Sequence, residues 1–142
     1  MKSIFFTGKG GVGKSTLSSA VAYQLSEQGN RVLAISFDPA HNLGDIYGMQ
    51  LSHVKKKVGK NLFLAEANLE KAAKEYVERN TDILTQVYSY TKAFNLDLYF
   101  KVLRHAPGVE EYAAVTAMEE VFRKEGDFDY IVFDTPPTAL TL

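Results

Sequence analysis

Residues 8–15 match the pattern G-x-x-x-x-G-K-[ST], and this short segment constrains the fold more than any other feature of the chain. Residues 3–7 come immediately before it; they are apolar, β-branched and aromatic, and predict a short buried strand. Residues 14–28 follow with apolar side chains at helical spacing and predict a helix, with Gly29 at its carboxyl end. A strand, a glycine-rich loop and a helix in this order begin a βαβ unit.

The elements predicted further along the chain favour a parallel sheet. Residues 31–37 predict a second strand, and its separation from the first suits a helical crossover between parallel strands. Residues 61–67 predict a weaker third strand, and residues 130–133 a final buried strand. Helical periodicity between these strands predicts a long helical region at 69–88 and a further helix at 110–124.

These elements predict an α/β fold with a mostly parallel sheet between layers of helices. Because no helix follows the last strand to cover the sheet, we expect residues 1–142 to be the N-terminal part of one domain. The basic run at 55–60 is expected to be a solvated turn, and the aromatic residues at 88–100 either pack between helices or form a partner-binding surface. In the first helix we expect an apolar stripe to face the core, formed by Leu17, Ala20, Val21 and Leu25.

The glycine-rich loop has the chemistry of a phosphate cradle, which makes the expected fold a three-layer P-loop NTPase. Glycine lets successive backbone N–H groups curl around an anion at the positive end of a helix. Lys14 would bring a cation to the outer phosphates, and the Ser15 hydroxyl would bind Mg²⁺, which prefers hard oxygen ligands. The alternative is a glycine-rich turn without a ligand. The expected ATP-binding residues of the loop are Gly8, Lys9, Gly10, Gly11, Val12, Gly13, Lys14, Ser15 and Thr16.

Two carboxylates follow predicted strands and should face the same crevice, because ligands of open α/β sheets lie beyond the carboxyl ends of the strands. Asp38 ends the second strand, and a simple turn before Pro39 would explain it equally well. Asp134 ends the last strand and is expected to hold Mg²⁺ through water; the alternative is a strand-ending turn.

Composition excludes several kinds of site and partner. Sixteen Lys and Arg against seventeen Asp and Glu give a net charge of −1, so no nucleic-acid partner is expected. The chain contains no cysteine, which excludes disulfides, cysteine-based zinc sites and thiol nucleophiles. No apolar run reaches the roughly 18 residues typical of a membrane span, and no secretory signal precedes the loop, so we expect a cytoplasmic protein.

Residues 9–16, Lys-Gly-Gly-Val-Gly-Lys-Ser-Thr, resemble the phosphate loop that carries an additional signature lysine, here Lys9. That loop marks the superfamily of dimeric ATPases containing MinD, ParA, the nitrogenase iron protein, the arsenite-efflux ATPase ArsA and the tail-anchored-protein targeting ATPase. The resemblance implies a homodimer through the nucleotide face, in which Lys9 assists catalysis by reaching the partner's nucleotide. Taken alone, Lys9 would be an exposed surface charge.

Residues 38–45, Asp-Pro-Ala-His-Asn-Leu-Gly-Asp, are similar to the first switch loop of ArsA and the tail-anchored targeting ATPases. The similarity implies that Asp38 orients or deprotonates the attacking water and that Asn42 contacts the γ-phosphate or that water. Gly44 replaces the usual Ser, which we expect to loosen the loop. His41 is expected to be structural, and not a metal ligand.

Residues 134–138, Asp-Thr-Pro-Pro-Thr, resemble the second switch of the same two families, and residues 106–111 resemble their P-G-[IV]-x-E segment. Ala139 and Leu140 replace the usual Gly and His of that switch, which marks a divergent member.

The resemblance implies an ArsA-like, Mg-dependent ATPase whose dimer opens and closes with the nucleotide, with Asp38, Lys9 and Lys14 as its catalytic residues. Its partner would be a membrane transporter subunit or a tail-anchored client protein. One alternative is a nucleotide-dependent positioning switch of the ParA or MinD type, with little hydrolysis. The other is a truncated interaction protein that does not hydrolyse ATP.

Overall fold

The computed structural model describes residues 1–38, 42–69, 71–75 and 109–136. The chain divides into two compact units, the first formed by Met1–Asn68 with Lys124–Leu142 and the second by Leu69–Arg123. Several sequence predictions fall outside the described residues: the role of His41, the aromatic segment at 88–100, and the switch positions Ala139 and Leu140.

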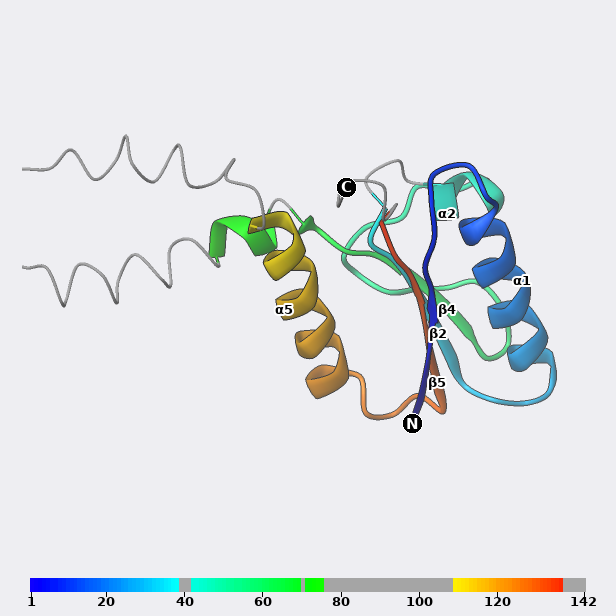
Figure 1. Cartoon of the computed structure of the whole chain (residues 1–142). Coiled ribbons are helices and arrows are strands. Elements are labelled where there is room, and N and C mark those ends of the chain that lie inside the picture. Colours follow the sequence, from blue (N-terminus) through cyan, green and yellow to red (C-terminus); the bar gives the residue numbers. More distant parts are fainter. Residues whose placement is uncertain (39–41, 70, 76–108, 137–142) are drawn as a thin grey trace, which may run out of the picture. The chain divides into compact units, whose positions relative to one another are not determined.

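The first unit is built on a five-stranded sheet in the order β1-β5-β2-β4-β3 (Figure 1). The pairs β1·β5, β5·β2 and β2·β4 are parallel, and only the short β3 runs antiparallel to its neighbour β4. The α/β fold with a mostly parallel sheet is therefore confirmed. The strands are β1 (Lys2–Phe6), β2 (Val32–Ser36), β3 (Lys56–Lys57), β4 (Leu62–Glu66) and β5 (Tyr130–Asp134).

All four strands predicted from the apolar runs are present, and β3 is an addition. It lies in the basic run at 55–60 that was expected to be a turn, and its two residues are exposed. The last strand of the chain, β5, lies between β1 and β2. The ends of the strands that precede the glycine-rich loop, the first switch and the second switch therefore lie side by side.

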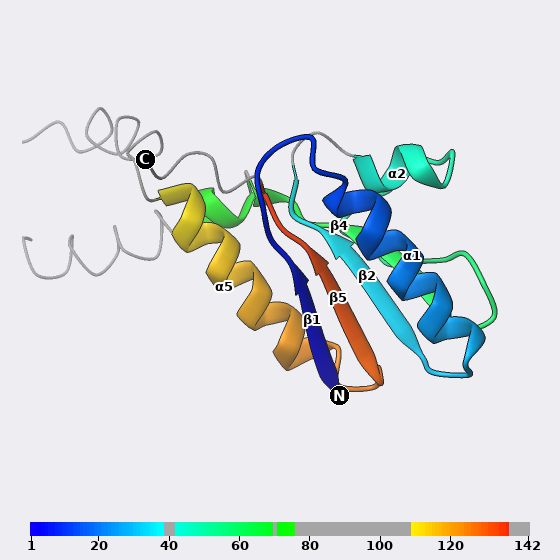
Figure 2. The same cartoon turned by 45° about the vertical axis from the view of Figure 1, so that its right-hand side comes forward.

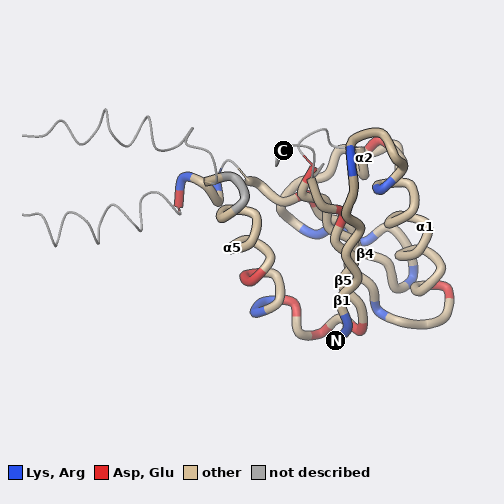
Figure 3. The backbone as a smooth tube through the Cα atoms, in the orientation of Figure 1, with Lys and Arg blue, Asp and Glu red and all other residues tan. Residues whose placement is uncertain are grey.

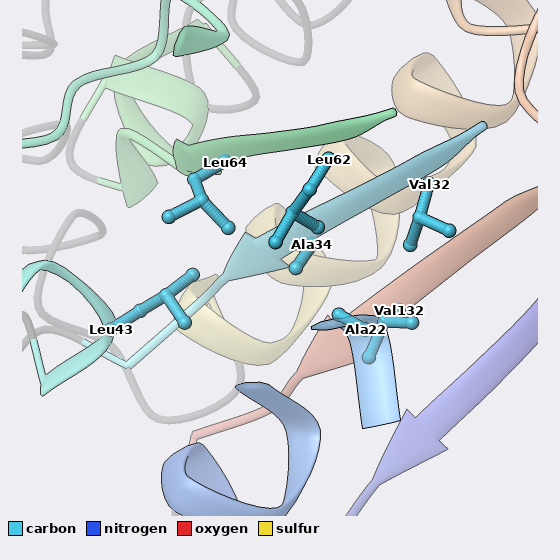
Figure 4. Close-up of a cluster of buried hydrophobic side chains, with 7 residues drawn as sticks. All are labelled: Ala22, Val32, Ala34, Leu43, Leu62, Leu64 and Val132. Carbon is cyan, nitrogen blue, oxygen red and sulfur yellow. The ribbon is translucent and has the colours of Figure 1, made fainter. Parts of the chain in front are cut away.

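Helix α1 (Lys14–Glu27) lies beside the sheet and contacts β1, β2, β4 and β5, as Figure 2 shows. The short helix α2 (Asn42–Ile46) contacts α1 at the end of the sheet that carries the loop. Between α1 and the sheet lies the apolar cluster drawn in Figure 4. Its members are Ala22, Val32, Ala34, Leu43, Leu62, Leu64 and Val132.

The buried face of α1 differs from the expected apolar stripe. Leu17 and Ala20 are exposed, and Val21 and Leu25 are only half-buried. Small side chains lie against the sheet instead: Ser15, Ser18, Ser19, Ala22 and Ser26. A helix with small residues on its inner face can approach the sheet closely, which brings the amino end of α1 near the strand ends. The apolar-stripe prediction was therefore wrong for Leu17 and Ala20, whereas Leu25 packs against the apolar cluster as expected.

The second unit contains two described helical segments. Residues 69 and 71–75 are helical, in agreement with the start of the predicted helical region, whose remainder lies outside the described residues. Helix α5 (Val109–Lys124) matches the helix predicted at 110–124. Within the described part of the chain, no helix is long and apolar enough to cross a membrane.

Candidate functional site at the carboxyl ends of the strands

The glycine-rich loop joins β1 to α1 at the carboxyl end of the sheet (Figure 1). Gly11 and Gly13 adopt left-handed φ values of 74° and 86°, which side chains disfavour and glycine accepts freely. Gly13 is the N-cap of α1, and no side chain of the described residues caps this helix end. The first amide groups of α1 therefore have no side-chain acceptor and are oriented for an anion.

Lys14 is held against the loop itself. Its Nζ donates a hydrogen bond to the carbonyl oxygen of Lys9 at 3.0 Å, and its side chain is buried. Lys9 is exposed, as both the surface-charge reading and the signature-lysine reading require. The loop thus carries two ammonium groups. That of Lys14 is fixed by a hydrogen bond to the loop backbone, and that of Lys9 is exposed.

Asp134 ends β5 and is almost completely buried, with 1% of its surface exposed. In the parallel register it is paired with Phe6 of β1 and with Ser36 of β2. The Ser36 Oγ donates to Asp134 Oδ2 at 3.5 Å, whereas Oδ1 is buried and has no hydrogen-bond partner among the described residues. A buried carboxylate oxygen without a hydrogen-bond partner destabilises the folded state unless a proton or a cation compensates its charge.

The electrostatic surroundings of Asp134 bring the predicted site residues together. Burial raises the pKa of the Asp134 carboxyl and is the largest effect. Hydrogen bonding with the Ser15 hydroxyl lowers this pKa, whereas repulsion by the Asp38 carboxylate raises it further. The Lys14 ammonium and the Ser36 hydroxyl lower it. Lys14, Ser15 and Asp38 are thus all close enough to act on Asp134, although Lys14 and Ser15 begin α1, Asp38 follows β2 and Asp134 ends β5.

Asp38 follows β2 and is half-buried at the start of the segment that is expected to form the first switch. The Asn42 amide Nδ2 donates to Asp38 Oδ2 at 3.3 Å, and the Asp38 backbone N–H donates to Ser36 Oγ at 3.2 Å. Asn42 and Asp38 therefore form a unit that spans the segment between β2 and α2. Asn42 is placed to orient the Asp38 carboxylate.

The residues around Asp134 fit a magnesium ion. Mg²⁺ takes hard oxygen ligands, commonly one or two from the protein with water completing the shell. The hydroxyl of Ser15, at the start of α1, would be such a ligand, and the buried Oδ1 of Asp134, at the end of β5, would accept a hydrogen bond from a water of the shell. Within the described residues there is no group of three or more His, Cys, Asp or Glu side chains that could hold a metal.

Sequence reasoning missed two hydroxyl residues of this region. The Ser36 hydroxyl lies between Asp134 and the Asp38 backbone, and Thr135 Oγ1 donates to the Phe6 carbonyl oxygen at 2.8 Å. Both residues are buried at the carboxyl ends of apolar strands. A hydroxyl that ends a buried strand next to a candidate site residue is the signal that could have indicated them.

Gly44 behaves differently from the expectation that it loosens the first switch. It is buried in α2, and a Cβ atom there would lie 2.7 Å from the Met49 carbonyl oxygen and 3.2 Å from Glu66 Oε1. The absence of a side chain at Gly44 thus lets the Met49 carbonyl and Glu66 pack closely against α2, and it is not a sign of backbone flexibility. Beside it is a pocket of about 350 Å³, lined by Gly44, Asp45, Met49, Gln50, Leu51 and Glu66.

Comparison with known proteins agrees with these features. The family model described as "Anion-transporting ATPase" matches residues 1–142. A putative arsenical pump-driving ATPase 2 of Aquifex aeolicus is 41% identical over 100% of this chain and 48% of its own length. An ATPase ASNA1 homolog of Dictyostelium discoideum is 37% identical over 100% of this chain and 40% of its length.

The arsenical pump-driving ATPase of Escherichia coli is 32% identical over 98% of this chain and 24% of its own length. The chain therefore spans less than half the length of these relatives. The match over the whole chain confirms the resemblance expected from the loop and switch motifs: the chain belongs to the ArsA-type family of anion-transporting ATPases.

Proposed function

We propose that this chain contains the ATP-binding and hydrolysing site of an ArsA-like ATPase, at the carboxyl ends of β1, β2 and β5. The observation that carries the proposal is the convergence on Asp134 of Lys14, Ser15 and Asp38. A loop that cradles phosphate, a hydroxyl and a carboxylate for a metal, and a second carboxylate for water are the parts that ATP hydrolysis requires.

Each residue would have a separate task. The loop amides and Lys14 would bind the phosphates, and Ser15 and Asp134 would hold Mg²⁺, Asp134 through water. The ion would neutralise charge that develops on the phosphate oxygens. Asp38, oriented by Asn42, would accept a hydrogen bond from the attacking water, because a loose transition state needs a positioned nucleophile more than a strong base.

The wider activity is also proposed from the family. Lys9 would reach the nucleotide of a second subunit, so that binding and hydrolysis drive opening and closing of a homodimer in the cytoplasm. The partner would be an anion transporter, since the matching family and the Escherichia coli relative are named for anion and arsenical transport. Targeting of tail-anchored membrane proteins is the second candidate, since the ASNA1 homolog matches the whole chain as closely as several pump ATPases do.

The first test measures nucleotide binding and turnover in the natural gene product with and without Mg²⁺. Replacing Lys14 by Ala removes a charge-assisted contact, so ATP affinity should fall about ten- to a hundredfold. Lys60→Ala is the matched control, because Lys60 is an exposed lysine in the turn before β4 and should leave affinity unchanged.

Calorimetry that finds equal affinity in the folded Lys14→Ala variant and the parent would overturn the proposed site. Tight binding with negligible turnover would instead favour the positioning-switch alternative, and no binding at all would favour the interaction protein.

A further inference from the structure

Ser36 is a fully buried hydroxyl residue for which the site as proposed has no task. It ends β2 with 1% of its surface exposed, in register with Asp134 on one side and with Glu66 on the other. A buried hydroxyl without partners costs free energy, so its hydrogen bonds indicate why a serine rather than an alanine occupies this position.

The Ser36 hydroxyl has two partners, and both are candidate site residues. It donates to Asp134 Oδ2 at 3.5 Å and accepts the backbone N–H of Asp38 at 3.2 Å. A hydroxyl has one donor and two acceptor lone pairs, so both contacts can exist together. One oxygen atom thus joins the proposed metal carboxylate to the first residue of the proposed water-positioning switch.

Strand pairing around this residue does not need the hydroxyl. The carbonyl oxygen of Ser36 accepts the Ala67 N–H at 2.8 Å, and the Phe37 N–H donates to the Asp134 carbonyl oxygen at 2.8 Å. These backbone bonds hold the end of β2 to β4 and β5. Removing the hydroxyl should leave the sheet intact while it releases the link between Asp134 and Asp38.

We propose that Ser36 is a positioning residue that couples the metal carboxylate of Asp134 to the switch residue Asp38. When Asp134 is oriented for Mg²⁺, the shared hydroxyl holds the Asp38 backbone in the position from which its carboxylate meets the attacking water. This inference rests on the proposed ATPase function and adds to it a physical connection between metal binding and the first switch.

The test is the Mg²⁺ dependence of nucleotide binding and of hydrolysis in the natural gene product carrying Ser36→Ala. The half-saturating Mg²⁺ concentration should rise and turnover should fall, each by about two- to tenfold, the range for an ordinary hydrogen bond, because the Ser36–Asp134 contact is 3.5 Å long. Nucleotide affinity without Mg²⁺ should not change, because Ser36 has no contact with the phosphate loop among the interactions above.

Ser26→Ala is the matched control. Ser26 is a buried serine of α1 whose Oγ donates to the Tyr23 carbonyl oxygen at 2.7 Å, remote from the site. It should lower thermal stability without moving the Mg²⁺ dependence. If Ser36→Ala behaves in the same way as Ser26→Ala, the positioning role is overturned and Ser36 is only structural.

Two further measurements keep the outcomes separate. Ser36→Cys retains the approximate shape and a weak donor, so it should give an intermediate Mg²⁺ shift; if the alanine variant does not fold, an unshifted cysteine variant overturns the proposal.

Mg²⁺-dependent ADP binding is measured beside turnover. A parent protein that binds Mg-ADP without hydrolysing ATP would refute the proposed ATPase, while the binding shift would still decide the role of Ser36.

Discussion

The two ends of the parallel sheet differ in how their polar groups are satisfied. At the amino end, the rings of Phe63 and Phe128 meet edge to face with centroids 5.3 Å apart. The guanidinium of Arg31 lies 5.4 Å and 4.9 Å from these two centroids. Lys55 lies over Phe128 as well, and its Nζ is 2.5 Å from Glu125 Oε2. Every one of these cations has a ring or a carboxylate as its neighbour.

At the carboxyl end, the same sheet buries a carboxylate whose Oδ1 has no hydrogen-bond partner in the described part of the chain. A second carboxylate, Asp38, is near enough to raise the pKa of Asp134 further. Figure 3 shows acidic and basic residues at both ends of the sheet, so the two ends differ in how these charges are compensated. The charges of the amino end are thus satisfied within the chain, whereas the carboxyl end buries a carboxylate oxygen that the proposed Mg²⁺ would compensate.

The largest expected effect is the loss of stability when the aromatic cluster at the amino end is removed. Phe128 is 2% exposed and carries the contacts with Phe63, Arg31 and Lys55, so Phe128→Ala should lower the free energy of unfolding by about 3–5 kcal/mol. Denaturant titration measures this. Tyr23→Ala, at an exposed aromatic of α1, should cost less than about 0.5 kcal/mol. Equal costs for the two variants would show that the amino-end cluster contributes no particular stability.

The next largest effect is a loss of turnover at the carboxyl end in a chain that stays folded. Asp38→Asn keeps the shape but weakens the contact with water, so turnover should fall by about a hundredfold or more. Nucleotide affinity should stay or rise slightly, because a negative charge near the phosphates is lost. Asp127→Asn, in the exposed loop before β5, is the control. Parent turnover in Asp38→Asn would reduce Asp38 to a turn residue and make Asp45 the next candidate.

The smallest expected effect is a change in stability when the uncompensated charge of Asp134 is removed, which would make the carboxyl end resemble the amino end in having its charges compensated. The pKa of Asp134 is raised above 3.8 in the folded chain, so the folded state binds more protons than the unfolded state above that pH. Stability should therefore be greatest below about pH 4 as far as this group is concerned, and decline as the pH rises through the folded pKa.

Asp134→Asn removes that ionisation. At neutral pH it should raise the melting temperature, because the buried ionised carboxyl is replaced by a neutral amide, while Mg²⁺-dependent turnover is lost. Scanning calorimetry across the pH range checks both the rise and its pH dependence. A melting temperature that falls at neutral pH would show that the carboxylate is already compensated within the chain.

Much of the architecture could be predicted from local sequence patterns. The glycine-rich loop, the strand and helix that flank it, and Asp38 and Asp134 at strand ends all follow from short-range signals. Apolar runs mark buried strands, and glycines mark the backbone positions with positive φ at Gly11 and Gly13. The order of the strands was not predictable in this way, because β5 enters between β1 and β2 from the far end of the chain.

What the sequence alone determined about this protein is thus its class of fold and its family, and it also indicated which residues to expect in the loop and in the two switches. The tertiary structure decided which face of α1 is buried, that Gly44 has no room for a side chain between the Met49 carbonyl and Glu66, and that Ser36 joins Asp134 to Asp38. Periodicity records how apolar a face is, but not how close a helix must come to a sheet. Likewise, the bond between Ser36 and Asp134 joins residues 98 positions apart, and only the pairing of β2 with β5 brings them together.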